Sequence, residues 1–123
     1  MTTERDARAY LTDMLDASDK AMGFVRGMTY EEFTDDERTA FAVIRALEIL
    51  GEAARHIPES MRRAYPDVPW QAAADMRNKL IHEYMQVSLP VVWKTVVRDL
   101  PSLSASIQRI LSGLGDTGSS TER

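Results

Sequence analysis

Several residue types and patterns are missing from this chain of 123 residues, and each absence excludes a class of protein. There is no cysteine, which excludes disulfides and thiol catalysis. The two histidines, His56 and His82, belong to no cluster of ligand residues, so we expect neither a bound metal nor a cofactor. No run approaches the roughly 18 apolar residues of a membrane-spanning helix. The charged start at residues 1–6 is unlike a signal peptide, and we expect a cytoplasmic protein.

Alternating strand patterns are absent as well, and apolar residues instead recur at intervals of three and four. This spacing is typical of amphipathic helices. It predicts long helices at 3–24, at 34–56, from 68 into the stretch 76–84, and from 88 to about 111, with an additional short helix at 61–65. The fold class is therefore all-α, an up-and-down four-helix bundle. We predict one domain at residues 1–112 and a disordered tail at 113–123, where apolar periodicity ends.

Local signals place the helix ends. Thr34 and Glu37 have the spacing of a capping box, in which each side chain bonds the backbone amide of the other residue, so we expect the second helix to start there. Ser88 is the expected N-cap of the fourth helix, with Pro90 tolerated in its first turn. Pro101 lies inside the pattern of that helix, which predicts a kink or a brief break.

The second predicted helix has apolar residues on more than one face. One face carries Ala40, Val43, Leu47, Leu50 and Ala54, and a further stripe carries Phe41, Ile44 and Ile49. Such a helix is buried on two sides, so it is either central to the bundle or part of a subunit interface. The segment before it, residues 28–33, is expected to be a connection that holds a short helical turn.

The net charge of −4 conceals an asymmetry along the chain. Residues 1–38 carry ten acidic and five basic residues, whereas residues 39–98 carry six acidic and eight basic ones. The net charge argues against a general nucleic-acid coat, yet the basic part surrounds the most reactive stretch of the sequence. The same charges also fit solvated helix faces with no partner.

That stretch, MRNKLIHEY at residues 76–84, places Arg77, Asn78, His82 and Tyr84 within eight residues. On an ideal helix, Arg77 and Tyr84 share a face, whereas His82 stands about 140° from Arg77. Two arrangements bring the imidazole and the guanidinium together. Either the helix ends before His82, or a second chain supplies the complementary group across a two-fold axis.

These groups fit cleavage of RNA without a metal ion. A neutral imidazole at His82 accepts the proton of a ribose 2′-hydroxyl, and the guanidinium of Arg77 stabilises the negative charge that builds on the phosphate. Asn78 is placed to orient the histidine or the phosphate. Glu52 is a candidate supporting residue, because a carboxylate on a buried helix needs a partner and Arg77 is the obvious one.

Plainer roles compete with these at each position. A histidine near a helix end, such as His82, is more often a structural residue than a catalyst. Tyr84 fits a half-buried packing residue with a solvated hydroxyl. His56 fits a cation that favours the negative end of a helix. Trp70 and Trp93 fit anchors of the core or of an interface better than platforms for base stacking.

The motif resembles that of a known family. Arg77, His82 and Tyr84 have the R-x4-H-x-Y spacing of the HEPN superfamily. The wider sequence is similar to its HepT toxin branch in several ordered segments, which are ILGEA at 49–53, VPW at 68–70, VW at 92–93 and LP at 100–101. The similarity runs from the first helix to about Leu111.

The resemblance implies an all-helical homodimer in which the two motifs face a shared cleft. Members of this family are ribonucleases that act as toxins in a type VII toxin–antitoxin module, and Arg77 and His82 match their catalytic pair. The resemblance further implies a minimal nucleotidyltransferase antitoxin that attaches AMP to Tyr84. Such groups would add negative charge and bulk where an RNA phosphate binds.

Two other interpretations remain open beside the ribonuclease. The chain fits a non-catalytic helical module that binds a nucleotidyltransferase, with Tyr84 as the modified residue. It also fits a structural dimer in which the motif only ends a helix.

Overall fold

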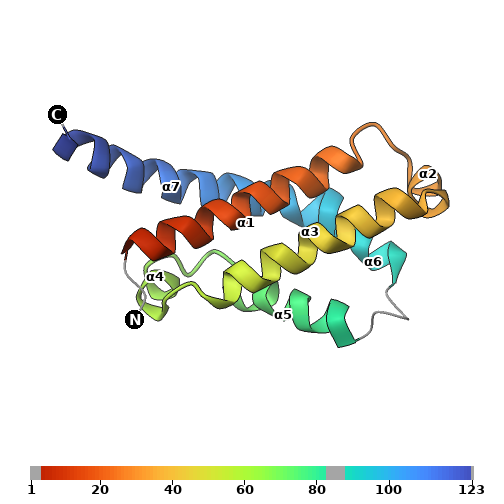
Figure 1. Ribbon diagram of the computed structural model, residues 1–123, viewed down its shortest axis with the longest axis horizontal. Coiled ribbons are helices and arrows are strands. Elements are labelled where there is room, and N and C mark those ends of the chain that lie inside the picture. Colours follow the sequence, from red (N-terminus) through yellow and green to blue (C-terminus); the bar gives the residue numbers. More distant parts are fainter. Residues whose placement is uncertain (1–3, 83–87, 123) are drawn as a thin grey trace.

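The computed structural model describes the backbone of residues 4–82 and 88–122 and the side chains of residues 6–76 and 88–114. Within these ranges the chain is helical and contains no strand. Four long helical segments alternate in direction, so the prediction of an all-α up-and-down bundle is confirmed (Figure 1). They are α1 (Glu4–Phe24), α3 (Glu37–Arg55), α5 (Trp70–His82), and a last segment made of α6 (Leu89–Lys94), the π-helical turn η2 (Thr95–Asp99) and α7 (Leu100–Glu122).

The core lies between α1, α3 and α7. Its fully buried large side chains include Leu11 and Met14 of α1, Leu47 and Leu50 of α3, and Ile107 of α7. Burial of one such side chain contributes about 1.5–3 kcal/mol to folding, so these positions account for much of the stability. In the described part of the chain no helix has the length and apolar character to cross a membrane.

The turn between α1 and α3 holds the short helix α2 (Tyr30–Asp35), as expected for this segment. The capping box, however, lies at Thr29 and Glu32: the Glu32 amide donates to Thr29 Oγ1 over 3.1 Å, and the Thr29 amide donates to Glu32 Oε1 over 2.9 Å. The predicted box at Thr34 is therefore wrong. Thr34 lies inside α2, where its hydroxyl donates to the Glu31 carbonyl. The same T-x-x-E spacing occurs five residues earlier, at Thr29 and Glu32, and there it forms the capping box of α2.

The N-cap of α3 is Asp36, whose Oδ1 accepts a hydrogen bond from the Thr39 amide over 3.0 Å and whose Oδ2 accepts one from the Thr39 hydroxyl over 2.8 Å. The bond from the Thr39 amide is the main cause that holds the pKa of Asp36 below its ordinary value. The ionised carboxylate therefore stabilises the start of α3 at neutral pH.

The two predicted apolar faces of α3 differ in the structure. The face with Val43, Leu47 and Leu50 is buried in the core. Phe41 and Ile49, from the second stripe, are 62% and 40% exposed. Ile44 of the same stripe packs partly against the core. Because α3 packs against both α1 and α5, the interpretation that it is central to the bundle is confirmed.

The predicted break at Pro101 is confirmed, and it takes the form of a wide turn. In η2 the Leu100 amide donates to the Thr95 carbonyl, five residues earlier. Proline has no amide hydrogen to donate, and its ring crowds the carbonyl four residues before it. The extra residue in this turn makes room for Pro101 while Val96 and Leu100 stay buried.

The last helix continues past the point where we predicted disorder. The backbone of α7 is helical to Glu122, whereas the tail was expected to begin at residue 113. Leu114 packs against the core, and its carbonyl oxygen accepts a hydrogen bond from the Arg8 guanidinium over 3.1 Å. Through these contacts the packed part of α7 includes Leu114. Each further residue of a helix that has already formed adds one backbone hydrogen bond.

Candidate functional site

The helix that carries the predicted motif is α5, and it is anchored at its start. Trp70 is 4% exposed, and its Nε1 donates to the Tyr65 carbonyl over 2.9 Å. Ala73 and Ala74 are buried, and α5 packs along α3 in the opposite direction (Figure 1). Small residues allow this close approach. The start of α5 and the adjoining α3 therefore fix the course of the helix that carries Arg77 and His82.

Arg77, Asn78 and His82 all lie on α5, in its last two turns. Their side chains lie outside the described residues, and so does the whole of Tyr84. The helix continues to His82, so the arrangement in which it ends before the histidine is not the one observed. The other arrangement, in which a second chain supplies the complementary group, stays a prediction.

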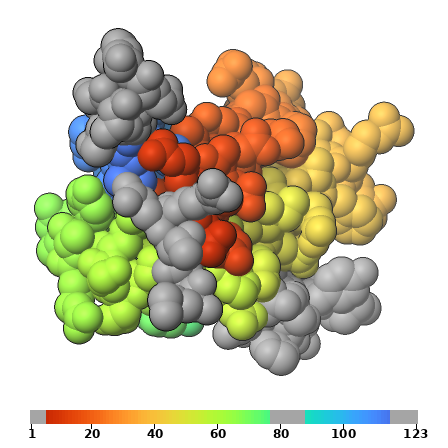
Figure 2. Space-filling model, turned by 60° about the vertical axis from the view of Figure 1, so that its left-hand side comes forward, coloured from red at the N-terminus to blue at the C-terminus, as the bar shows by residue number. Residues whose placement is uncertain are grey.

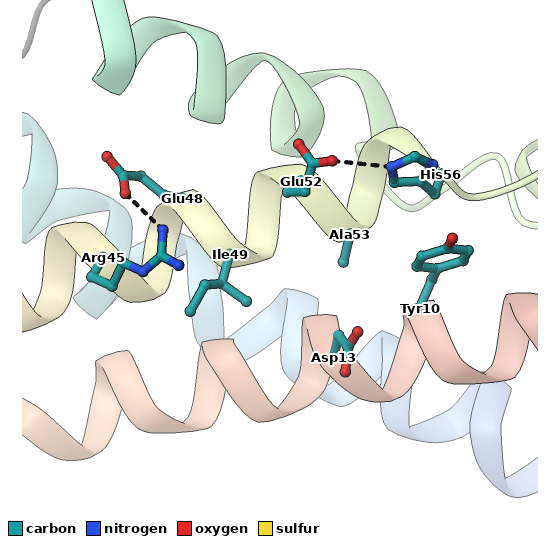
Figure 3. A pocket seen from close by; sticks show the side chains of 8 residues that line it. All are labelled: Tyr10, Asp13, Arg45, Glu48, Ile49, Glu52, Ala53 and His56. Atoms are coloured by element: carbon teal, nitrogen blue, oxygen red, sulfur yellow. Dashed lines mark hydrogen bonds and ion pairs between the residues drawn. The ribbon is translucent and has the colours of Figure 1, made fainter.

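Beside α5, α3 presents a row of charged side chains between α1 and α5 (Figure 3). Glu52 Oε2 lies 3.0 Å from His56 Nε2, and Glu52 Oε1 lies 3.5 Å from the Arg55 guanidinium. The predicted partner of Glu52 was Arg77, whose side chain lies outside the described residues. The contacts with His56 and Arg55 thus hold the Glu52 carboxylate near the end of α3, on the side of that helix next to α5.

His56 is held from two sides. Its ring stacks on that of Tyr10 of α1, with centroids 4.9 Å apart and 16° between the planes, and Glu52 holds its Nε2 (Figure 3). The predicted position at the end of α3 is confirmed, since His56 is the C-cap residue. Sequence reasoning missed the stack, because no local pattern pairs residues 46 positions apart.

A recess of about 390 Å³ opens between α1 and α3 at this point. It is lined by Tyr10, Asp13, Arg45, Glu48, Ile49, Glu52, Ala53 and His56. Three of these residues are carboxylates, and the guanidinium of Arg45, which also lines the recess, lies 3.3 Å from Glu48 Oε1. The recess is therefore acidic on balance, which disfavours a phosphate. Among the described residues no three His, Asp or Glu side chains are placed to hold a metal ion.

Part of the positive charge around the motif has a structural role. The Arg62 guanidinium donates to the carbonyl oxygens of Ala54 and Ile57, over 3.0 and 3.3 Å. It therefore caps the end of α3, which has the partial negative charge of a helix C-terminus. Trp93 packs against Tyr30 and Phe33, and with the buried Trp70 this confirms that both tryptophans are anchors of the fold.

Comparison with known proteins agrees with the motif. A family model described as Ribonuclease HepT-like matches residues 14–110, which include the whole stretch 76–84. The chain belongs to the Ribonuclease HepT-like family. No solved structure matches it.

Among HepT-like relatives, one named "Probable ribonuclease HepT", from Thermococcus cleftensis, is 44% identical over 107 residues, which cover 87% of this chain and 97% of the relative. A second, from Methanocaldococcus jannaschii, is named as a candidate RNase and is 39% identical over 90% of this chain and 96% of its own length. A third, from Caldanaerobacter subterraneus, is also named as a candidate RNase and is 36% identical over 85% of this chain and 93% of its own length. The family likeness therefore covers the bundle as a whole.

Proposed function

We propose that this protein is a metal-independent endoribonuclease that works as a homodimer in the cytoplasm, with Arg77 and His82 as its catalytic residues and Asn78 as an assisting group. The observation that carries the proposal is the R-x4-H-x-Y motif, whose arginine and histidine lie on the last turns of α5, inside the region that matches the Ribonuclease HepT-like family. The names of the relatives, which refer to ribonucleases, support the same activity.

The proposed reaction uses only groups of the protein. The imidazole of His82 takes the proton from a ribose 2′-hydroxyl, and the 2′-oxygen attacks the adjacent phosphorus. The bond to the 5′-oxygen breaks, and this oxygen takes the proton back from the imidazolium of His82, which returns to its neutral form. The guanidinium of Arg77 stabilises the extra negative charge on the phosphate oxygens. The products are a 2′,3′-cyclic phosphate and a free 5′-hydroxyl.

The course of α5 supports the proposed homodimer. Because the helix reaches His82, one chain directs positions 77 and 82 to different sides. A two-fold axis near the motif places the arginine of one copy beside the histidine of the other. The catalytic pair is then complete only in the dimer.

We further propose that the protein is the toxin of a type VII toxin–antitoxin module and that a minimal nucleotidyltransferase antitoxin attaches AMP to Tyr84. Tyr84 stands two residues after His82 in the motif. AMP groups there would repel an RNA phosphate and fill the space it needs. Mass spectrometry of the protein co-expressed with a nucleotidyltransferase tests this step through AMP increments on the peptide that contains Tyr84. An unmodified Tyr84 in a co-purifying complex would contradict it.

Single substitutions test the nuclease itself. His82→Ala and Arg77→Ala should each reduce RNA cleavage by at least about 100-fold, the usual loss for a general base or a charge-stabilising group, and should abolish growth arrest. Lys20→Ala is the matched control, because Lys20 is an exposed cation on α1 that pairs with Asp16. Full activity in either motif variant would remove the proposal.

A non-catalytic module that binds a nucleotidyltransferase is the second candidate, and the same motif tyrosine favours it. In that case Tyr84 is modified while wild-type protein and His82→Ala show the same absence of RNA cleavage. The ribonuclease and the binding module are distinguished by RNA cleavage: His82→Ala abolishes it in the first case and changes nothing in the second.

A further inference from the structure

An apolar groove of about 400 Å³ lies between the end of α1 and the η2 turn. We call it the η2 groove. Figure 2 shows the end of α1, in orange, at the surface of the molecule. Among the described residues that line the groove, Arg26 alone is charged. The lining consists of Met22, Val25, Arg26, Gly27, Met28, Trp93, Val96, Val97 and Pro101.

The wall that α6 and η2 contribute to the η2 groove carries positive charge. Between Ser88 and Asp99 the chain has two cations, Lys94 and Arg98, and no acidic residue. Both cations are exposed, and each directly follows a residue that lines the groove. Residues four apart lie on the same side of a helical segment. Lys94 and Arg98 therefore form a cationic edge beside the apolar lining.

The three cations at the η2 groove are available to an anion. In the described part of the chain, neither Arg26 nor Lys94 nor Arg98 pairs with a carboxylate, whereas two arginines of α3 pair with glutamates of their own helix. Asp19, on the same half of α1, is held by the Ser104 hydroxyl, which donates to its Oδ1 over 2.8 Å. Exposed cations without a partner attract phosphates.

The η2 groove also lies within reach of the motif. Six residue steps separate His82 from Ser88, so the two lie at most about 22 Å apart. The last turn of α5 and α6 stand at the same end of the bundle (Figure 1). The recess between α1 and α3, on the other side, is acidic, with Glu48 and Glu52 in its lining. Charge therefore favours the α6–η2 side as the path of an RNA strand that leaves the motif.

We propose that the η2 groove binds a single-stranded segment of the RNA substrate, with its phosphates on Arg26, Lys94 and Arg98 and one unstacked base in the apolar groove beside Trp93. This proposal rests on the proposed ribonuclease function and assigns it a substrate-binding surface. Contacts of lysine and arginine with phosphates give affinity that does not depend on sequence. Unpaired bases bind to apolar and aromatic surfaces.

RNA binding can be measured without cleavage in the His82→Ala variant. Fluorescence anisotropy in EDTA, with a labelled single-stranded RNA of about 20 nucleotides, gives the dissociation constant at several salt concentrations; such a strand exceeds the roughly 4–16 nucleotides that one binding surface covers. Adding Lys94→Ala and Arg98→Ala should lower the salt slope by about 1.4, or about 0.7 for each lost phosphate contact, and should raise the dissociation constant about 10-fold or more.

A matched control removes the same charge elsewhere. Arg63 and Arg109 are both exposed, and Arg109 lines a recess with Ala64 and Tyr65, beside the end of α4 and at the opposite end of the bundle from α6 (Figure 1). Arg63→Ala with Arg109→Ala should leave the salt slope unchanged. An equal fall in both double variants, or no fall in either, would overturn the proposed surface.

Tryptophan emission reports on the groove itself. Trp93 lines the groove, whereas Trp70 is 4% exposed and lies at the start of α5. The RNA should therefore change the emission of the His82→Ala protein, and the change should be lost with Lys94→Ala and Arg98→Ala. Bound RNA that leaves the emission unchanged would overturn the placement of a base beside Trp93.

The surface and the nuclease can fail separately. Wild-type cleavage together with a salt slope that does not depend on Lys94 and Arg98 would refute the surface alone. In that case an acidic amphipathic helix of a protein partner would be the fitting occupant of the groove. A slope that falls as predicted, in a protein whose wild type cleaves no RNA, would refute the nuclease alone.

Discussion

The ring of His56 lies nearly parallel to that of Tyr10, with centroids 4.9 Å apart and an angle of 16° between the planes. This stack joins the end of α3 to α1. It also closes one end of the recess between the two helices, while Glu52 holds the other side of the imidazole. His56 is therefore part of the framework beside the motif, whereas His82 is the histidine that we propose as catalytic.

The stack should be measurable as a coupling between its two rings. We expect Tyr10→Leu and His56→Ala to be less destabilising together than the sum of their separate effects, with a coupling of about 0.5–1.5 kcal/mol. Urea denaturation of the four proteins of the double-mutant cycle gives this value. Strictly additive effects would show that the two rings do not stabilise each other.

The cap that Arg62 places on α3 gives a second prediction. Arg62→Met should lower the free energy of unfolding by about 1.5–3 kcal/mol, because two carbonyl oxygens lose charged donors. Arg63→Met is the matched control, since Arg63 is the exposed neighbour on the same short helix, α4 (Glu59–Ala64), and should change stability little. Equal losses in both variants would mean that net charge, and not the cap, is what matters.

Asp36 gives a prediction of pH dependence. Its hydrogen bonds with Thr39 lower its pKa in the folded state, so its contribution to stability is present above the ordinary pKa of an aspartate, about 3.9. That contribution is lost as the pH falls through the lowered folded-state pKa. The difference in melting temperature between wild type and Asp36→Asn should therefore shrink on acidification from pH 6 to pH 3. A difference that stays constant over this range would contradict the assignment.

Helical periodicity was sufficient to predict the class of fold and most helix boundaries. The spacing of Val43, Leu47 and Leu50 marks the core side of α3, and Pro101 marks the wide turn, because both effects act within a few residues. The capping box was misplaced at Thr34, since Thr29 and Glu32 carry the same signal one turn earlier. The end of α7 was placed too early, because the contact that holds Leu114 comes from Arg8, at the other end of the chain.

The prediction of the candidate site rests more on the sequence motif than on the geometry of the described residues. Arg77, Asn78 and His82 were predicted from the motif and its chemistry, and the structure adds that α5 remains helical to His82. The surroundings could not be predicted, because the contact of His56 with Tyr10 depends on how α1 and α3 pack. The exposure of Phe41 likewise depends on how α3 packs against the other helices.

The most direct test of the proposed nuclease is incubation of purified dimer, free of AMP, with total RNA in EDTA, with wild type and His82→Ala side by side and the 3′ ends of the products analysed. We expect cleavage by the wild type alone, with 2′,3′-cyclic phosphate ends, because the imidazole and guanidinium groups act without a metal ion. Equal cleavage by His82→Ala, or no cleavage by folded, dimeric wild type, would contradict the central claim.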